Sequence, residues 1–166
     1  MIDHTTVDVS AQGYLWGADP TPLLLKAIPP TSPETNRFDL LLLSDLLFNH
    51  SCHASLLSTI KLTLAKPSAD IPPTAPIPLA LVFFTPHRPW LYDKDIAFLT
   101  LAREQGFRVE QIVQEVLEKP MFDEDKGDVE LRRTVFGYTL TWAEGGEEER
   151  RRRIKREGRE GGRGRG

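Results

Sequence analysis

The chain has 166 residues, of which 40% are hydrophobic, so it is long enough to form one domain with an ordinary core. Its formal charge of -3 is unevenly distributed. Residues 144–166 hold 9 basic and 6 acidic side chains, which leaves 12 basic and 18 acidic side chains in residues 1–143. An acidic body excludes a uniformly basic nucleic-acid-binding surface, so we expect no DNA partner.

The cysteine content and the N-terminal residues predict the cellular compartment of the protein. Cys52 is the single cysteine, which allows no internal disulfide and is typical of a reducing compartment. Residues 1–4 lack the basic and apolar regions of a signal peptide, and the longest apolar runs are too short to span a bilayer. We therefore expect a cytoplasmic protein that does not associate with membranes.

The first third of the chain predicts a strand, a helix and a second strand. Val7 and Val9 alternate with polar neighbours, which favours a short strand that ends at Gly13. Residues 19–29 are bounded by prolines and carry an aliphatic run, which is typical of a helix. The apolar run 38–43 is too short for an isolated helix and suits a parallel strand that is buried on both faces.

The next segments alternate between helical and strand patterns. The predicted elements are helix 53–65, a proline-rich loop 66–78, strand 79–84, helix 93–105, and strands 107–117 and 132–142. Gly106 would stop the second of these helices. The last two strands would form a hairpin around the charged segment 123–130, so the order indicates an α/β fold with an antiparallel element at its end.

Residues 144–166 predict a disordered tail outside a domain formed by residues 1–143. The tail contains one sizeable aliphatic residue, Ile154, among glutamate, arginine and glycine, and cannot build a core. It ends in RGRG, which leaves RNA binding as an alternative to a solvated extension.

The octapeptide SDLLFNHS at residues 44–51 gathers polar groups where the buried strand ends. In open α/β sheets, ligands bind outside the carboxyl ends of the strands. The carboxylate of Asp45, the ring of Phe48 and the amide of Asn49 are therefore candidate site residues.

A phosphate loop and a metal centre are not predicted. The five glycines of residues 1–143 do not cluster into a phosphate-binding loop. His50, Cys52 and His53 lie too close together, with no second group of ligands, to indicate a metal site.

Four ordered motifs carry a resemblance to a known family. They are GYLWG at 13–17, FDLLLLSDLLFNHS at 38–51, FFTPHRPW at 83–90 and LRRTVFGYTLTW at 131–142. Together they resemble the C-terminal portion of the fungal protein N-terminal and lysine methyltransferases, which are class I enzymes that use S-adenosylmethionine. The resemblance implies a Rossmann-like sheet of seven strands in the order 3-2-1-4-5-7-6, of which strands three to seven are present and the last strand is antiparallel.

The same resemblance assigns roles to four residues. It implies that Trp16 contacts the cofactor near its adenine, that Ser44 meets the cofactor, that Asp45 orients the acceptor amine and that Phe48 forms an aromatic wall. Residue type alone makes Asn49 and His50 candidates for positioning the amine or removing its proton. The residues alone leave alternatives: Trp16 packed under the sheet edge, Asp45 as a helix N-cap and Phe48 in the core.

The resemblance predicts an S-adenosylmethionine-dependent protein methyltransferase that acts on the N-terminal amine and a lysine of translation elongation factor 1-alpha. The family's glycine-rich motif after its first strand has no counterpart in this sequence, so we expect the isolated chain not to bind the cofactor measurably. Two alternatives are a non-catalytic remnant or interaction module, and a small-molecule methyltransferase acting on nicotinamide.

Overall fold

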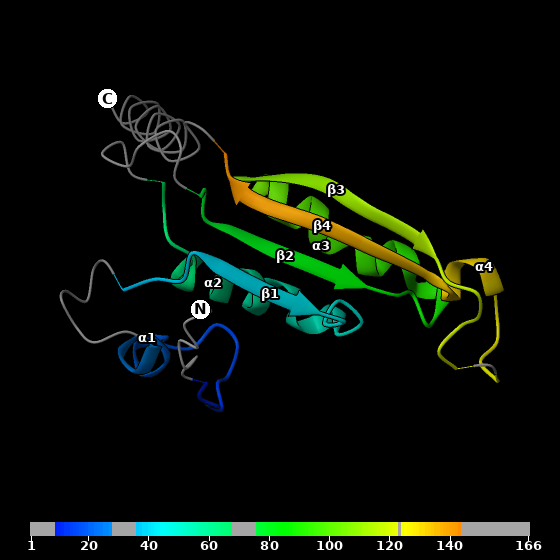
Figure 1. Ribbon diagram of the computed structural model, residues 1–166, viewed down its shortest axis with the longest axis horizontal. Coiled ribbons are helices and arrows are strands. Elements are labelled where there is room, and N and C mark those ends of the chain that lie inside the picture. The colour runs from blue at the N-terminus through cyan, green and yellow to red at the C-terminus, as the bar shows by residue number, and fades with distance from the viewer. Residues whose placement is uncertain (1–8, 28–35, 68–75, 123, 144–166) are drawn as a thin grey trace, which may run out of the picture.

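The computed structural model describes residues 9–27, 36–67, 76–122 and 124–143, which form a mixed α/β fold around a four-stranded sheet. The strands are β1 (Leu40–Ser44), β2 (Leu79–Phe84), β3 (Phe107–Val116) and β4 (Thr134–Trp142). Their order across the sheet is β1-β2-β4-β3 (Figure 1). β1 and β2 are parallel, whereas β4 is antiparallel to both β2 and β3, so the antiparallel hairpin is confirmed.

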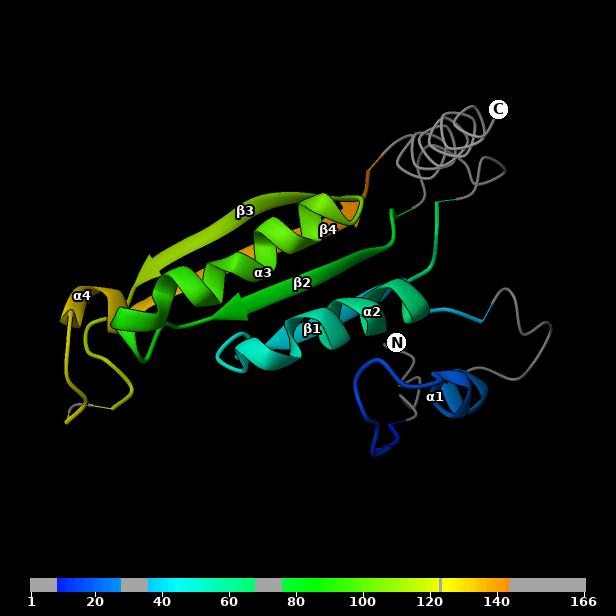
Figure 2. The ribbon, with the colours of Figure 1, turned by 180° about the vertical axis from the view of Figure 1, so that it is seen from behind.

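Two helices cover one face of this sheet, as Figure 2 shows from behind. They are α2 (His53–Thr63) and α3 (Tyr92–Glu104), preceded by the 3-10 turns η1 (His50–Cys52) and η2 (Pro89–Leu91). Two shorter helices, α1 (Thr21–Ala27) and α4 (Val129–Arg132), lie away from this layer. Gly106 follows α3 with φ 94°, a left-handed conformation that confirms the predicted stop signal.

The core lies between this helix layer and the sheet. On α2, Leu57 is fully inaccessible and Leu56 and Ile60 are nearly so. Phe98 of α3 is also fully buried, and the centroid of its ring lies 5.4 Å from that of the His53 ring. Phe98 therefore links the two helices.

On the opposite face of the sheet, the side chains of Phe83 and Val113 lie close to Gly137 of β4. A Cβ atom added there would lie 2.6 Å from Phe83 Cε1 and 2.9 Å from Val113 Cβ, so a side chain at this position would displace its neighbours. On the covered face, burial raises the pKa of Tyr138, an effect that the charge of Arg103 opposes. Burial thus disfavours the charged phenolate form of this side chain.

The predicted strand before Gly13 is wrong in the part that the structure describes. Residues 9–15 form no ladder, and Val7 lies outside the described residues. The alternation there favoured a strand, but a strand also needs a neighbour to pair with, and none of the described strands supplies one. The chain instead turns onto α2, where the N–H of Gly17 donates to Thr59 Oγ1 at 2.8 Å.

The prediction that β1 is buried on both faces is also wrong. Leu43 is 5% exposed, but Leu40 and Leu42 are 57% and 66% exposed. β1 forms an edge of the described sheet, and among the described residues no helix lies in front of it in Figure 1. Its apolar sequence is that of a strand with two covered faces, whereas its observed surroundings cover one.

The other predicted strands and helices after residue 36 are confirmed to within a few residues. The short helix α4 was missed; Asp128 caps it by accepting a hydrogen bond from the N–H of Leu131 at 3.0 Å. The end of the helix predicted at 19–29, most of the loop at 66–78 and the tail at 144–166 lie outside the described residues. Across the part of the chain that is described, no helix has both the length and the apolar character needed to cross a bilayer.

Candidate functional site

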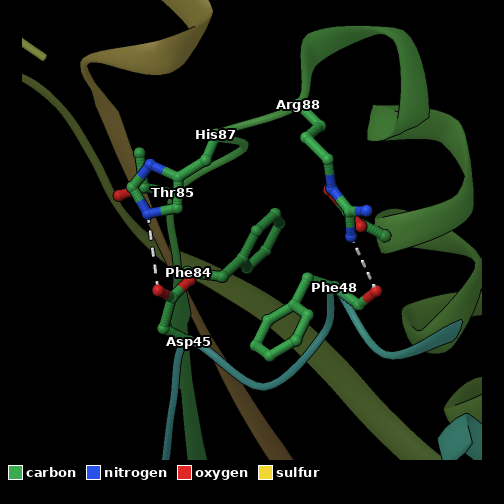
Figure 3. Close-up of a pocket in the computed structure, with 7 residues that line it drawn as sticks. Asp45, Phe48, Phe84, Thr85, His87 and Arg88 are labelled. Atoms are coloured by element: carbon green, nitrogen blue, oxygen red, sulfur yellow. Dashed lines mark hydrogen bonds and ion pairs between the residues drawn. The ribbon is translucent and has the colours of Figure 1, made fainter. Parts of the chain in front are cut away.

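A cavity of about 270 Å³ opens at the carboxyl ends of β1 and β2. This is the position at which an open α/β sheet places its ligands. Figure 3 shows the surrounding side chains, among them two aromatic rings between an acid–imidazole pair and an arginine. The cavity is lined by Asp45, Phe48, Phe84, Thr85, His87, Arg88 and Asp95.

Asp45 has an unusual backbone conformation. Its φ of 55° is the only positive value among the non-glycine residues that the structure describes. This region costs most residues about 1–3 kcal/mol, and aspartate tolerates it better than most. The N–H of Asp45 donates to the Phe83 carbonyl at 2.7 Å, which fixes the turn directly after β1. The turn directs the carboxylate to the cavity mouth, where it is half exposed.

The carboxylate of Asp45 faces His87. Asp45 Oδ2 lies 3.4 Å from His87 Nε2, and the imidazole is 25% exposed (Figure 3). The alternative of Asp45 as an N-cap is wrong, because Asn49 and Cys52 occupy the residues before η1 and α2. Neither helical segment receives a side-chain cap. The acid is therefore available to a ligand rather than committed to a helix end.

Phe48 forms one wall of the cavity. Its side chain is 57% exposed, so the alternative that it packs in the core is wrong. Its carbonyl accepts a hydrogen bond from Arg88 Nη2 at 3.1 Å, which joins the turn after β1 to the turn after β2. The buried ring of Phe84 forms a second apolar wall.

A partly buried histidine–aspartate pair joins the segment after β1 to α3. His50 Nε2 lies 2.7 Å from Asp95 Oδ1 in the first turn of α3, and the Asp95 side chain is 7% exposed. The neighbouring His53 is within 2.8 Å of the Leu47 carbonyl. These two imidazoles hold the segment between β1 and α2 against the helix layer, and this accounts for His50 without a metal.

His50→Ala should destabilise the chain by about 1–3 kcal/mol, because it leaves the buried Asp95 carboxylate without this partner. Urea unfolding measures the change. The double variant His50→Ala with Asp95→Ala should be more stable than the sum of the two single variants implies. Strict additivity of the two changes would contradict a coupled pair.

Three predicted site residues do not line the cavity. Ser44 is exposed at the end of β1, in register with Phe83. Asn49 accepts a hydrogen bond from Ser51 Oγ at 3.1 Å. Trp16 is half-buried and packs against the core. Asp45 and Phe48 thus come together, while the cofactor roles of Trp16 and Ser44 stay predictions.

Sequence reasoning placed residues 85–89 where substrate-side loops belong, but it assigned no individual role to His87 or Arg88 and none to Asp95. The signal for the first two was present, because TPHRPW directly follows β2. Two neighbouring parallel strands end at the same edge of a sheet, so the residues after β2 were expected beside those after β1. Asp95 carried no comparable signal, since an acid in the first turn of a helix is usually a surface residue.

The described residues do not by themselves build a site for S-adenosylmethionine. The cavity is smaller than the roughly 300–1,000 Å³ typical of sites for drug-sized ligands. No glycine cradle opens onto the cavity. A Cβ added at Gly17 would contact Ser55, and the Phe83 side chain occupies the space that a Cβ at Gly137 would need. The described ranges also contain no group of three or more His, Cys, Asp or Glu side chains that could hold a metal.

No protein-family model matches the chain, but curated proteins similar to it are methyltransferases. Each of those described here is named protein N-terminal and lysine N-methyltransferase EFM7. The Gibberella zeae protein is 44% identical over 135 residues, which cover 81% of this chain and 48% of that protein. The Neurospora crassa protein is 44% identical, with 81% and 45% coverage. The Schizosaccharomyces pombe protein is 40% identical, with 80% and 48% coverage. The chain thus spans about half the length of the curated relatives it matches.

Proposed function

We propose that this chain forms the acceptor side of a protein methyltransferase whose methyl donor is S-adenosylmethionine. The acceptor is an N-terminal or lysine amine, and the protein substrate is translation elongation factor 1-alpha. The observation that supports this proposal is the pairing of a half-exposed carboxylate with an aromatic wall in a cavity at the strand ends. The names of the relatives support a protein amine over nicotinamide.

The chemistry of the cavity fits an amine. An incoming ammonium group would form a charge-assisted hydrogen bond with Asp45, and the faces of Phe48 and Phe84 would favour its positive charge. Methyl transfer requires a neutral amine with a free lone pair. The carboxylate of Asp45, which would hold the ammonium group, is also placed to accept the proton that it loses, and His87 Nε2 lies 3.4 Å from the same carboxylate, where it can orient it.

A complementation assay tests the proposal. The chain is mixed with a polypeptide corresponding to the part of the Gibberella zeae relative that it does not match, and methyl incorporation from S-adenosylmethionine is measured. We expect methylation of purified elongation factor 1-alpha and none of nicotinamide. Either component alone should be inactive, and the chain alone should show no cofactor binding by isothermal titration.

The other outcomes separate the alternatives. Methylation of nicotinamide but not of the protein would favour a small-molecule enzyme. A stable complex that methylates neither acceptor would contradict the proposal and favour an interaction module. Micromolar binding of S-adenosylhomocysteine by the chain alone would contradict the expectation drawn from the missing glycine cradle.

A further inference from the structure

We propose that an exposed apolar surface beside the cavity docks a basic segment of the substrate protein that carries an apolar side chain near the acceptor amine. This inference rests on the proposed function. The surface, called here the apolar rim, consists of Trp90, Met121 and Phe122. It lies on the turn after β2 and on the loop between β3 and α4.

The three side chains of the rim are largely exposed, although large apolar side chains are usually buried. Trp90, Met121 and Phe122 are 64%, 76% and 52% exposed. Single exposed apolar residues are normal, but adjoining large ones mark interaction surfaces. Aromatic residues and methionine are enriched in protein interfaces, where they supply much contact area.

The rim is connected to the cavity through Phe122. The Phe122 ring meets the imidazole of His87 edge-on, with centroids 5.2 Å apart, and His87 in turn faces Asp45. The carbonyl of Phe122 accepts a hydrogen bond from Arg132 Nη1 at 2.8 Å, and Arg132 is 4% exposed. A buried guanidinium therefore anchors the loop and sets Phe122 at the cavity mouth.

The loop that carries Met121 and Phe122 also packs, at Gly127, against the turn that carries Trp90. Gly127 adopts φ 97°, and a Cβ placed there would lie 3.2 Å from Pro89 Cγ and 3.5 Å from Trp90 Cε3. Glycine at this position lets the β3–α4 loop lie directly on the turn after β2. The rim is thus formed in advance, which lowers the entropy cost of binding.

The charge around the rim sets the chemistry of its partner. Carboxylates outnumber ammonium groups among the described residues of this loop, and all of these charged residues are exposed. They are Glu118, Glu124, Asp125 and Asp128, against Lys119 and Lys126. The excess of carboxylates beside the rim favours a positively charged partner over an acidic one.

The size of the cavity explains why such a surface is needed. About 270 Å³ has room for one acceptor side chain, and that side chain is the same in every lysine. Discrimination among lysines must then come from residues beside the acceptor. An apolar neighbour on the rim and basic neighbours opposite the carboxylates match the two features that the surface offers.

Fluorescence anisotropy with the full chain tests the inference. The probe is a labelled peptide with one acceptor lysine, one leucine and two arginines; matched peptides replace the leucine by serine or the arginines by glutamates. We expect Trp90→Ala and Met121→Ser each to raise the Kd for the probe about fivefold or more. Ile77→Ser, at a residue that is 63% exposed beyond the other end of β2, is the control and should leave the Kd unchanged.

A separate variant tests the contribution of charge to peptide binding. Glu124→Gln combined with Asp125→Asn should weaken binding at low salt, and the difference from the unmodified chain should shrink as salt is raised. Both matched peptides should bind more weakly than the probe. Circular dichroism should show the same folded signal for every variant, because the substituted residues are exposed.

Failure of this inference is distinguishable from failure of the proposed function. An unchanged Kd in Trp90→Ala and Met121→Ser, or no binding of the probe to the unmodified chain, would overturn the rim as a docking site while the complementation assay still reports on methyl transfer. Rim-dependent binding without methyl transfer would keep the docking site and contradict the function. Light scattering that shows a dimer lost in Trp90→Ala would assign the rim to a second copy of the chain and overturn the inference.

Discussion

Asp45→Asn should lower kcat/KM for elongation factor 1-alpha in the complementation assay about 10- to 100-fold. The variant keeps the size of the side chain, and asparagine tolerates the left-handed backbone at φ 55°, so the turn after β1 should be preserved. It removes the negative charge that would hold the substrate ammonium. A hydrogen bond to a charged group is worth about 1.5–3 kcal/mol, which corresponds to this range.

Asp39→Asn is the matched control for this variant. Asp39 is also exposed and precedes the same strand, but it does not line the cavity. We expect its kcat/KM to equal that of the unmodified chain, and both variants to show the same urea midpoint. An equal loss of kcat/KM in both variants would indicate a general effect of charge. An unchanged kcat/KM in Asp45→Asn would contradict the role of Asp45 in holding the amine.

Phe98→Ala should destabilise the chain by about 3–5 kcal/mol. The ring is fully buried on α3 and packs 5.4 Å from the imidazole of His53 on α2, so its removal leaves a cavity between the two helices and the sheet. Because small domains are typically stable by about 5–15 kcal/mol, this is a large part of the total. Urea unfolding followed by circular dichroism measures the change.

Phe48→Ala makes the same chemical change at an exposed position. It should cost within about 0.5 kcal/mol in stability, as surface substitutions usually do. It should nevertheless lower methyl transfer, because the ring forms a wall of the cavity. A similar loss of stability in both variants would show that burial does not distinguish the two rings.

Local pattern was sufficient to predict most of the fold. The leucine and isoleucine spacing of α2 is a helical stripe that has to face a core, and Gly106 ends α3 by adopting a conformation that few residues tolerate. The aromatic and β-branched residues of β4 favoured a strand irrespective of its partner. Each of these signals lies within one helix or strand, so it can be interpreted without knowing which elements pack against that helix or strand.

The errors concern features that depend on neighbouring elements. The alternation before Gly13 is a strand pattern, but whether a strand forms is decided by pairing. The leucines of β1 indicate two covered faces, yet their exposure follows from what packs on the sheet. Asp45 follows a strand and precedes a helix, where an N-cap is common, but the residues before η1 and α2 are Asn49 and Cys52.

The candidate site was partly predictable for the same reason. Asp45 and Phe48 lie in one octapeptide, so their proximity was evident from the sequence. His87 and Asp95 reach the site through the pairing of β1 with β2 and through the packing of α3. Residue type and spacing along the chain do not contain that information for Asp95, whereas the position of His87 after β2 does indicate the site.

The open face of β1 links the folding of this chain to its association. Burying the side chains of Leu40 and Leu42 would contribute about 1.5–3 kcal/mol each. Any polypeptide that covers them binds the folded chain in preference to the unfolded one, so its concentration shifts the folding equilibrium by mass action. The melting temperature of the chain would then act as a titration readout for whatever covers this face, independently of any chemistry at the cavity.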